Sequence, residues 1–328
     1  MSSYKETGWR GVALGLALAG SAAAVGCTLD DRVEGDDKWY LDVTLPDVQT
    51  DIVPGEPNGC DLSGIWIAEL QTFSTAFVSA TAVAYNWFYY EIDDQGDTFE
   101  VTRGWDCGFE VTNATAVFLY PETRRALALR NRQEGVIDST AESPVEVAPR
   151  TGVYRPDPND PSQCEFSMER WWWLRGAEAR FAPPRENYGW SITEAQNWRA
   201  LPTKDNPSGE VDIEDDGKPG IWLEVTAPIV GSNQRHVVQR DWNQFGPFSV
   251  EDGAEEFVGP ATFDNQESIF EVSISLLNAT STANASGHTI RFRRITEQAP
   301  VAINDFVIWC QDNVEDVMRA SRPAPTDD

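Results

Sequence analysis

The feature of this sequence that most constrains its fold is a series of short β-type segments between Cys60 and Cys310. The segments are rich in Val, Ile, Thr and aromatic residues, and Gly, Asp, Asn or Pro separates one from the next. Clear examples are GIWIAEL at 64–70 and FSMERWWWL at 166–174. This pattern predicts a mainly β, antiparallel fold, either a barrel or a sandwich, with at most one short C-terminal helix within residues 313–328.

Two parts of this β region resemble each other. The tripeptide Gly-Ile-Trp at 64–66 recurs at 220–222, and later aromatic residues match in the same order at a slowly drifting offset. We therefore predict two related β units, residues 60–205 and 206–312. Because a lone sheet has apolar faces and edges to cover, the units are expected either to join as halves of one barrel or sandwich or to form two small barrels in series.

The first 26 residues have the organisation of a secretion signal. Lys5 and Arg10 precede an uncharged run, residues 11–26, that consists mostly of Ala and Gly. As a helix, these 16 residues would span about 24 Å, which is shorter than the hydrocarbon core of a bilayer at about 30 Å. We interpret residues 1–26 as a signal peptide and not as a permanent membrane span.

A cleavage motif ends this run. Ala24-Val25-Gly26-Cys27 resembles the lipobox of bacterial lipoprotein precursors. The resemblance implies that Cys27 receives a diacylglyceryl group and that the chain is cut just before it. The lipid would then hold the protein at a membrane of the bacterial cell envelope, with the outer membrane as the expected location. The alternative is ordinary secretion, with cleavage after Ala24.

The number of cysteines favours lipidation over ordinary secretion. The chain has five cysteines, and lipidation of Cys27 leaves four, which can all pair. Ordinary secretion would leave one unpaired thiol in an exported protein, which is unusual. Three connectivities exist for four cysteines. We favour Cys107–Cys164, which would clamp the insertion between these residues, and Cys60–Cys310, which would tie the start of the fold to its end.

Residues 27–59 are predicted to form an acidic tether between the lipid and the fold. After Cys27 this stretch contains nine Asp or Glu against two basic residues, together with three prolines. Removal of residues 1–26 leaves 25 − 2 = 23 basic and 53 − 1 = 52 acidic side chains, a net charge of −29. A charge of this sign argues against nucleic acid as a partner.

The start of the first β segment resembles a motif of another family. Gly64-x-Trp66 is similar to the Gly-x-Trp sequence with which lipocalin barrels begin. In lipocalins the Trp packs under the floor of the barrel, often against an Arg late in the chain. The resemblance implies the same contact for Trp66, with Arg291, Arg293 or Arg294 as the partner. We assign no ligand site from this resemblance.

Few residues of the chain suit catalysis. His236 and His288 are its only histidines, and it has no Gly-x-Ser-x-Gly elbow, P-loop or His-Glu-x-x-His motif. A glycoside hydrolase needs only two carboxyl groups, about 5 to 9.5 Å apart, and Glu91 and Glu169 beside aromatic runs are the candidates. We predict that the protein is not an enzyme and keep a carboxylate-based hydrolase as an alternative.

One acidic stretch has part of a calcium motif. Asp212, Glu214 and Asp216 occupy alternate positions before Gly217, as in the first half of a calcium-binding loop. Leu223 then stands where the loop needs a bidentate Glu, and a polar turn before the next strand explains the same residues. We therefore predict no cofactor and keep Ca²⁺ at these three residues as the one candidate.

Trp171, Trp172 and Trp173 are the remaining candidate ligand-binding residues. In a strand, the first and third would face one side and the second would face the other. An exposed row of Trp would suit a glycan or a protein partner, because the indole combines a large rigid surface with a polar N–H. Packing in the core is the interpretation that we favour.

These features together predict an exported, lipid-anchored protein of the cell envelope with a non-catalytic binding or structural role. A glycan-binding module that uses exposed Trp, and a carboxylate-based hydrolase, are the alternatives. The membrane, contacted through the lipid on Cys27, is the predicted partner, and the sequence specifies no protein or glycan partner.

Overall fold

The structure, a computed structural model, describes residues 60–76, 80–113, 116–119, 131–132, 135–136, 150–160, 162–212, 217–227, 231–273, 278, 280–300 and 303–322. All of them belong to one compact unit, Glu56–Asp328. The predicted signal peptide, Cys27 and the predicted tether lie outside the described residues.

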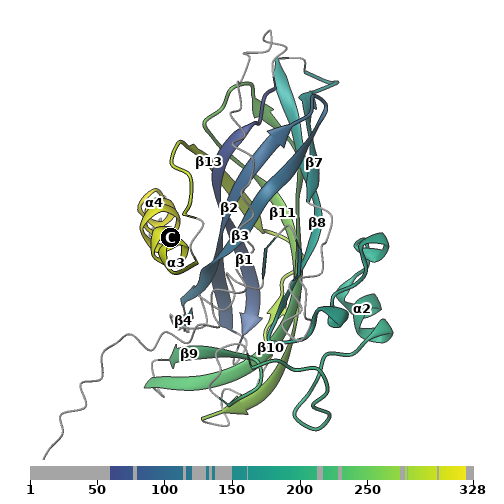
Figure 1. The fold of residues 1–328 in the computed structure, drawn as a ribbon, viewed down its shortest axis with the longest axis vertical. Coiled ribbons are helices and arrows are strands. Elements are labelled where there is room, and N and C mark those ends of the chain that lie inside the picture. Colours follow the sequence, from purple (N-terminus) through teal and green to yellow (C-terminus); the bar gives the residue numbers. More distant parts are fainter. Residues whose placement is uncertain are drawn as a thin grey trace, which may run out of the picture. The chain divides into compact units, whose positions relative to one another are not determined.

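Ten antiparallel strands form a closed ring, so the protein has the mainly β fold that the sequence predicts (Figure 1). The strands of the ring are β1 (Gly64–Ala76), β2 (Ala80–Asp94), β3 (Thr98–Asn113), β4 (Ala116–Leu119), β7 (Thr151–Pro156), β8 (Gln163–Arg175), β9 (Ile221–Ala227), β10 (Gly231–Glu251), β11 (Glu256–Val272) and β13 (Thr289–Ile295). The two-residue strands β5 (Asn131–Arg132), β6 (Gly135–Val136) and β12 (Thr282–Ala283) pair beside the ring.

The ring closes in two ways along its length, because β3 and β10 are long enough to have two sets of neighbours. The first residues of β3 pair with β7, which pairs with β8, which pairs with the second part of β10. The last residues of β3 pair with β4, which pairs with β9, which pairs with the first part of β10. We call these two parts of the barrel the β7–β8 half and the β4–β9 half, and we count Arg175 and Asp241, at the junction where β8 ends, with the β4–β9 half.

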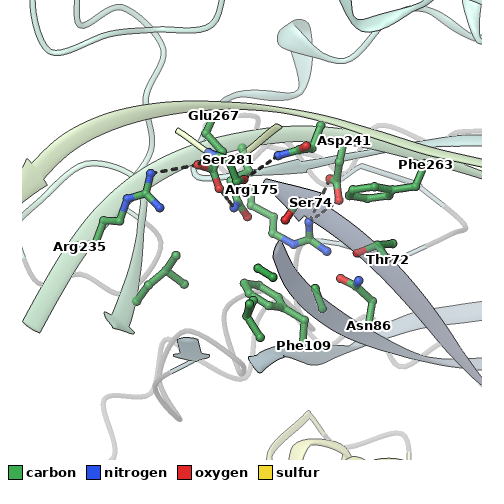
Figure 2. Close-up of a pocket in the computed structure, with 16 residues that line it drawn as sticks. Thr72, Ser74, Asn86, Phe109, Arg175, Arg235, Asp241, Phe263, Glu267 and Ser281 are labelled. Carbon is green, nitrogen blue, oxygen red and sulfur yellow. Dashed lines mark hydrogen bonds and ion pairs between the residues drawn. The ribbon is translucent and has the colours of Figure 1, made fainter. Parts of the chain in front are cut away.

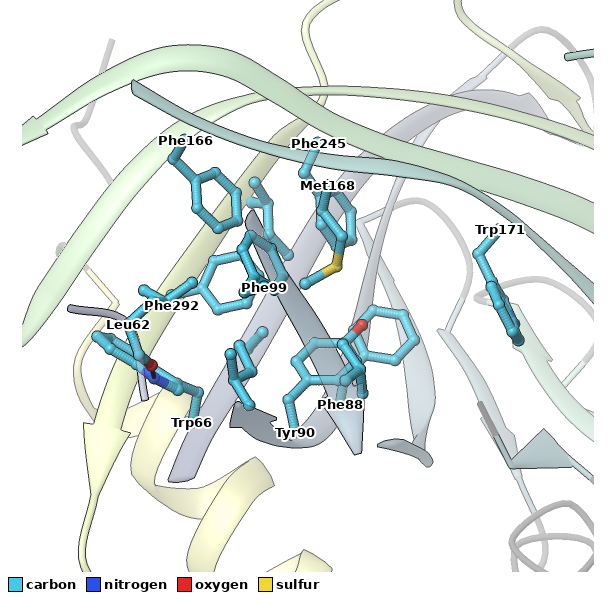
Figure 3. Packing of buried hydrophobic residues seen from close by; sticks show 14 of the residues in the cluster. Leu62, Trp66, Phe88, Tyr90, Phe99, Phe166, Met168, Trp171, Phe245 and Phe292 are labelled. Atoms are coloured by element: carbon cyan, nitrogen blue, oxygen red, sulfur yellow. Dashed lines mark hydrogen bonds between the residues drawn. The ribbon is translucent and has the colours of Figure 1, made fainter. Parts of the chain in front are cut away.

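Large side chains fill the interior of the β7–β8 half (Figure 3). The buried cluster includes Trp66, Leu70, Phe88, Tyr90, Phe99, Phe166, Met168, Phe257 and Phe292. The ring centre of Phe166 lies 5.1 Å from that of Phe257 and 5.2 Å from that of Phe292. Alternate residues of each strand supply this cluster, which explains the period of two in the sequence pattern.

Trp66 makes the contact that the lipocalin resemblance implies, and Arg294 of β13 is the partner. The guanidinium carbon of Arg294 lies 4.5 Å from the centre of the Trp66 ring. Arg294 also donates hydrogen bonds to the carbonyls of Ser63 and Asp61, and the Trp66 indole N–H donates to the Leu62 carbonyl at 2.8 Å. This set of contacts fixes the chain where it enters β1.

The C-terminal region is helical and packs on the outer face of β1, β2 and β3 (Figure 1). It consists of α3 (Ile303–Cys310), a π-helical turn (Gln311–Glu315) and α4 (Asp316–Ala320). The helix therefore begins before residue 313, the predicted start. Trp309 packs edge-on against Tyr89, with ring centres 5.3 Å apart, and Phe306 packs against Trp105. The helix thus covers aromatic residues on the outer face of the barrel.

The described residues contain two disulfides, and their pairing differs from the predicted one. Cys60 is bonded to Cys164, and Cys107 is bonded to Cys310, so the predicted pairs Cys107–Cys164 and Cys60–Cys310 are wrong. Cys60 and Cys164 belong to the packed interior cluster, whereas Cys107 and Cys310 belong to the cluster between the barrel and the C-terminal helix. The spacing of cysteines in a sequence does not tell which face of a sheet each one occupies.

Strands from both predicted β units belong to the same ring, so the units form one joint barrel. Each Gly-Ile-Trp tripeptide begins a hairpin, and Gly64 and Gly220 have positive φ angles of 130° and 96°. The tripeptides nevertheless face opposite sides of the sheet. Trp66 lies in the interior, whereas Trp222 stacks on His236 at 6.1 Å between ring centres, on the face opposite to the buried Ile221 and Leu223.

The segment between β8 and β9 covers the outer face of β8 and β10. It contains two 3-10 turns, Ala179–Phe181 and Arg185–Asn187, and helix α2 (Ile192–Trp198). The Trp172 indole N–H donates to the Tyr188 carbonyl at 3.0 Å, and Arg240 donates to the Phe181 carbonyl at 2.8 Å. Among the residues that the structure describes, no helix is long and apolar enough to cross a membrane.

Candidate functional site

The β4–β9 half of the barrel contains a cavity of about 90 Å³ (Figure 2). Side chains from β1, β2, β3, β8, β9, β10 and β11 converge on it. The lining residues are Thr72, Ser74, Ala82, Ala84, Asn86, Phe109, Val111, Arg175, Leu223, Arg235, Gln239, Asp241, Phe263, Asn265, Glu267 and Ser281.

The cavity exists because the inward-facing side chains change in size and polarity along the same strands. On β1 the sequence of inward residues is Trp66, Ala68 and Leu70 in the packed half, followed by Thr72 and Ser74 beside the cavity. On β2 the inward residues likewise change from aromatic side chains to Asn and Ala. Small residues leave open the space that aromatic rings occupy in the other half.

One wall of the cavity carries a buried cluster of three charges. Arg175, the last residue of β8, donates through Nη1 to both carboxylate oxygens of Asp241 at 2.9 Å and through Nη2 to Asp106 at 2.7 Å. The Gly108 backbone N–H also donates to Asp106, at 2.8 Å. None of the three charged side chains is more than 8% exposed. Two carboxylates therefore share one guanidinium inside the barrel.

An irregularity in β3 helps to place this cluster. Trp87 of β2 pairs with Gly108, but the next residue, Phe88, pairs with Asp106, so β3 contains one extra residue at this point. Such a bulge changes which residues face each side of a sheet. As a result Asp106 reaches Arg175, and Phe109, three residues later, lines the same cavity.

Burial and charge act in opposite directions on the groups of this cluster. Burial raises the pKa of the Asp241 carboxyl above its usual value of 3.8, although Arg175 favours its charged form. Burial disfavours the Arg175 cation, but Asp241 and Asp106 outweigh this effect and raise the pKa of the guanidinium. Arg175 therefore stays charged, and the unfavourable effect of burial is seen at the Asp241 carboxyl.

A second ion pair in the cavity wall is balanced. Glu267 accepts hydrogen bonds from Arg235 at 3.0 Å, from the Gln239 side chain at 2.9 Å and from the Ser281 backbone N–H at 3.1 Å. Three donors thus satisfy the Glu267 carboxylate, and its negative charge is matched by Arg235. The remaining wall combines apolar residues, among them Ala82, Ala84, Leu223 and Phe263, with neutral polar residues such as Asn86.

The three consecutive tryptophans form no exposed platform. Trp171, Trp172 and Trp173 are each at most 1% exposed. Trp173 stacks on Phe88 with ring centres 5.6 Å apart, and Trp172 points to the opposite face, where its N–H reaches Tyr188. The core packing that we favour from the sequence is therefore present, and these rings offer no surface to a glycan.

The calcium candidate lies mostly outside the described residues. Asp212 is described, and its Oδ2 accepts a hydrogen bond from the Gly217 backbone N–H at 2.7 Å. Glu214 and Asp216 are not among the described residues. The calcium site therefore stays a prediction.

The two carboxylates considered for hydrolysis are partners of arginines and do not line the cavity. Glu91 forms an ion pair with Arg103 at 2.9 Å and accepts a hydrogen bond from the Tyr89 hydroxyl at 2.6 Å. Glu169 forms an ion pair with Arg185 and accepts a hydrogen bond from the Thr151 backbone N–H at 2.7 Å. Each of the two is thus held by a different arginine.

The histidines have structural contacts. His288 accepts a hydrogen bond from the Phe73 N–H at 3.2 Å, so its other ring nitrogen donates to the Asn284 carbonyl at 2.9 Å. Burial lowers the pKa of His288, which favours this neutral form. His236 stacks on Trp222 on the outside of the barrel.

A second hollow, of about 220 Å³, lies in the segment that covers β8 and β10. Arg180, Arg199 and Asn206 are among the residues that line it. Its guanidinium groups already have partners, because Arg180 pairs with Glu178 and Arg199 donates to the Arg180 carbonyl. We assign no ligand to this hollow.

Sequence reasoning did not identify Arg175, Asp241 or Asp106 as site residues. The only local signal is a charged residue two positions after a residue that faces the interior. Arg175 follows Trp173 in this way on β8, and Asp241 follows Gln239 on β10. That signal has meaning only once the inward face of each strand is known.

Comparisons with known proteins add no assignment to this site. The chain matches no family model and no curated protein. The cavity and the motifs of the sequence are therefore the basis for a functional proposal.

Proposed function

We propose that this protein is an exported, lipid-anchored protein of the bacterial cell envelope that binds a small molecule in the cavity of its barrel and catalyses no reaction. The observation that carries the binding role is the cavity of about 90 Å³ in the β4–β9 half. Protein interiors normally contain few voids larger than a water molecule. A larger void with a few convergent polar groups is the usual form of a small-molecule site.

The cavity limits the size of the ligand. An apolar cavity of about 150 Å³ holds benzene, so a cavity of about 90 Å³ suits a smaller molecule. Its apolar residues, such as Leu223 and Phe263, would cover the ligand body, and polar groups such as Asn86 would orient it.

The non-catalytic part of the proposal is supported by the state of the carboxylates. A carboxyl group that acts as an acid or base in catalysis must be within reach of the substrate and have a pKa suited to proton transfer. Asp241 and Glu267 line the cavity, but each is already held by an arginine. Glu91 and Glu169 lie outside the cavity.

The proposed location is supported by the sequence alone. The lipobox-like residues that end in Cys27 provide the anchor, and residues 28–59, as a flexible coil, would place the barrel on the order of 30 Å from it. We expect the wild-type protein in the membrane fraction, with an intact mass that shows a lipid on an N-terminal Cys27. The Cys27→Ser variant should leave that fraction. A membrane-bound chain that begins at Val25 without lipid mass would show that the anchor proposal is wrong.

The binding role can be tested on the full chain in detergent with a library of small fragments, detected by NMR of the ligands. Ala84→Leu places a larger apolar group in the cavity, and Val258→Leu adds apolar volume at an exposed position of β11 as a control. We expect fragments that bind the wild type and Val258→Leu but not Ala84→Leu. Thermal unfolding of each variant checks that it is folded.

Two results would contradict the binding role. One is a library in which no fragment binds the wild type. The other is a set of bound fragments whose affinities are the same in folded Ala84→Leu, because those fragments would then occupy another surface.

A further inference from the structure

The four charged side chains that line the cavity, Arg175, Arg235, Asp241 and Glu267, balance one another, but Asp106 lies behind the wall and adds a negative charge. Arg235 and Glu267 form one balanced pair. The other group consists of Arg175 with Asp106 and Asp241, one positive side chain against two negative ones. These five described side chains together carry two positive and three negative charges, so this group has one more negative charge than positive ones.

An uncompensated charge in a buried place is unfavourable, because it has lost water and has no full partner in exchange. Of the two carboxylates in this group, Asp241 lines the cavity and Asp106 does not. The Asp241 carboxylate, held on one side by Arg175 Nη1, thus presents its excess negative charge to whatever occupies the cavity.

Neutral polar groups face the same space. The Asn86 amide and the Thr72 hydroxyl make no side-chain hydrogen bond within the part of the chain that the structure describes, and both are nearly buried. Figure 2 shows them across from the Arg175–Asp241 pair. The Asn265 Oδ1 atom is also buried without a partner there. Amide and hydroxyl oxygens of this kind accept hydrogen bonds from a charged N–H donor.

The rest of the wall suits a short apolar body. Ala82, Ala84, Val111 and Leu223 offer aliphatic surface, and the Phe109 and Phe263 rings flank it. Aromatic rings also attract cations through their negatively polarised faces. A carboxylate ligand, in contrast, would add a second uncompensated negative charge to the cavity.

We propose that the ligand of this cavity is a small organic cation, an ammonium group on a short aliphatic body, with the ammonium beside Asp241 and within reach of Asn86. This inference rests on the proposed binding function and names its substrate class. The cation would supply the positive charge that the Arg175 cluster lacks. The aliphatic part would lie against the wall formed by β2, β3 and β9.

Three probes of nearly the same shape separate charge from size: isobutylamine, which is a cation at neutral pH, isobutanol and isobutyrate. Each is titrated into the full chain in detergent, and its dissociation constant is measured by ligand NMR. We expect isobutylamine to bind at least tenfold more tightly than isobutanol, and isobutyrate to bind most weakly. Asp241→Asn should weaken isobutylamine at least tenfold and leave isobutanol unchanged. Asp93→Asn, the same charge change at an exposed position of β2, should alter neither.

The outcomes distinguish this inference from the binding function itself. Equal affinities for the three probes, or a preference for isobutyrate, would overturn the cation and leave the binding function in place. Binding of library fragments without any binding of isobutylamine would do the same. A wild-type protein that binds neither the probes nor any fragment would overturn both proposals. The ranking of the probes on the wild type decides the question even if Asp241→Asn fails to fold.

Discussion

The two halves of the barrel share five long strands, β1, β2, β3, β10 and β11, yet their interiors have opposite character. In the β7–β8 half, aromatic rings pack against one another, with Phe166 in contact with Phe257 and Phe292 (Figure 3). In the β4–β9 half, small and polar residues leave a cavity that is walled by paired charges around Arg175 and Glu267 (Figure 2). The backbone ring is continuous through both halves.

Because the strand arrangement is common to both halves, the inward-facing residues must determine whether a half is packed or open. A ring of strands can be held together by packing in one region, because burial of large apolar side chains is the main favourable contribution to folding. That packing allows the other region to keep an unfilled space with charged walls, which by itself would stabilise the fold little. We therefore expect stability to depend on the β7–β8 half and binding to depend on the β4–β9 half.

The largest expected contrast comes from removing one ring in each half. Phe166→Ala should lower the free energy of unfolding by about 4 kcal/mol, because it opens a hole in a close-packed cluster. Phe109→Ala should lower it by about 2 kcal/mol, because its ring already borders a cavity and has fewer neighbours to lose. Denaturant unfolding with the disulfides intact measures both values. Equal losses of unfolding free energy in the two variants would contradict the proposed division of the interior into a packed half and an open half.

The next effect concerns the charges of the β4–β9 half. Arg175→Met should lower the free energy of unfolding by about 3 kcal/mol, because it leaves Asp106 and Asp241 buried without their cation. Arg155→Met is the matched control, since Arg155 pairs with Glu165 on the exposed surface of the β7–β8 half and should contribute less than about 1 kcal/mol. If the two variants lose the same free energy of unfolding, the Arg175 cluster is hydrated and is not a buried network.

A smaller effect is expected when volume is added to each half. A methyl group on Gly152 of β7 would lie 2.2 Å from the Phe99 ring and 2.3 Å from the Ser167 carbonyl oxygen, so Gly152→Ala should lower the free energy of unfolding by about 2 kcal/mol. Ala84→Leu adds more volume but points into the cavity, and its effect should stay below about 1 kcal/mol. A large loss from Ala84→Leu, with little loss from Gly152→Ala, would reverse the assignment of packed and open halves.

The parts of the fold that depend on local pattern could be predicted from the sequence. Alternation of apolar residues gives the strands, and the Gly-x-Trp motif led to the contact between Trp66 and a late arginine, which is Arg294. The alternation also places Trp172 on the face opposite to Trp173. What covers the outer face could not be predicted, because the segment over Trp172 has irregular structure with few pattern signals.

The parts that depend on distant pairing could not be predicted. The disulfides join Cys60 to Cys164 and Cys107 to Cys310 because these residues lie on two different faces of the barrel, which the spacing of cysteines does not reveal. The charge cluster has the same difficulty: Arg175 is 66 residues from Asp241 in sequence and 69 from Asp106. A bulge in β3 also changes which of its residues face the interior. The site could therefore be located only once the closed ring of strands was known.

The smallest effect compares one carboxylate in each half through the pH dependence of stability. Burial raises the pKa of Asp241, so the folded state binds its proton more tightly than the unfolded chain, and its contribution to stability is lost as pH rises. Asp157, at the turn after β7, has the opposite behaviour. The Ser249 hydroxyl donates to it at 2.6 Å and lowers its pKa, so its contribution is lost as pH falls.

Replacing each carboxyl by an amide removes these contributions and should reveal their opposite signs. As pH rises between about pH 2 and pH 7, the unfolding free energy of Asp157→Asn should fall relative to that of the wild type below about pH 4, and that of Asp241→Asn should rise relative to it above about pH 4. Urea unfolding of the three proteins across this pH range measures both trends. If the two trends have the same sign, the interior charge of the β4–β9 half is already compensated, and the division between a packed half and a charged half does not extend to its electrostatics.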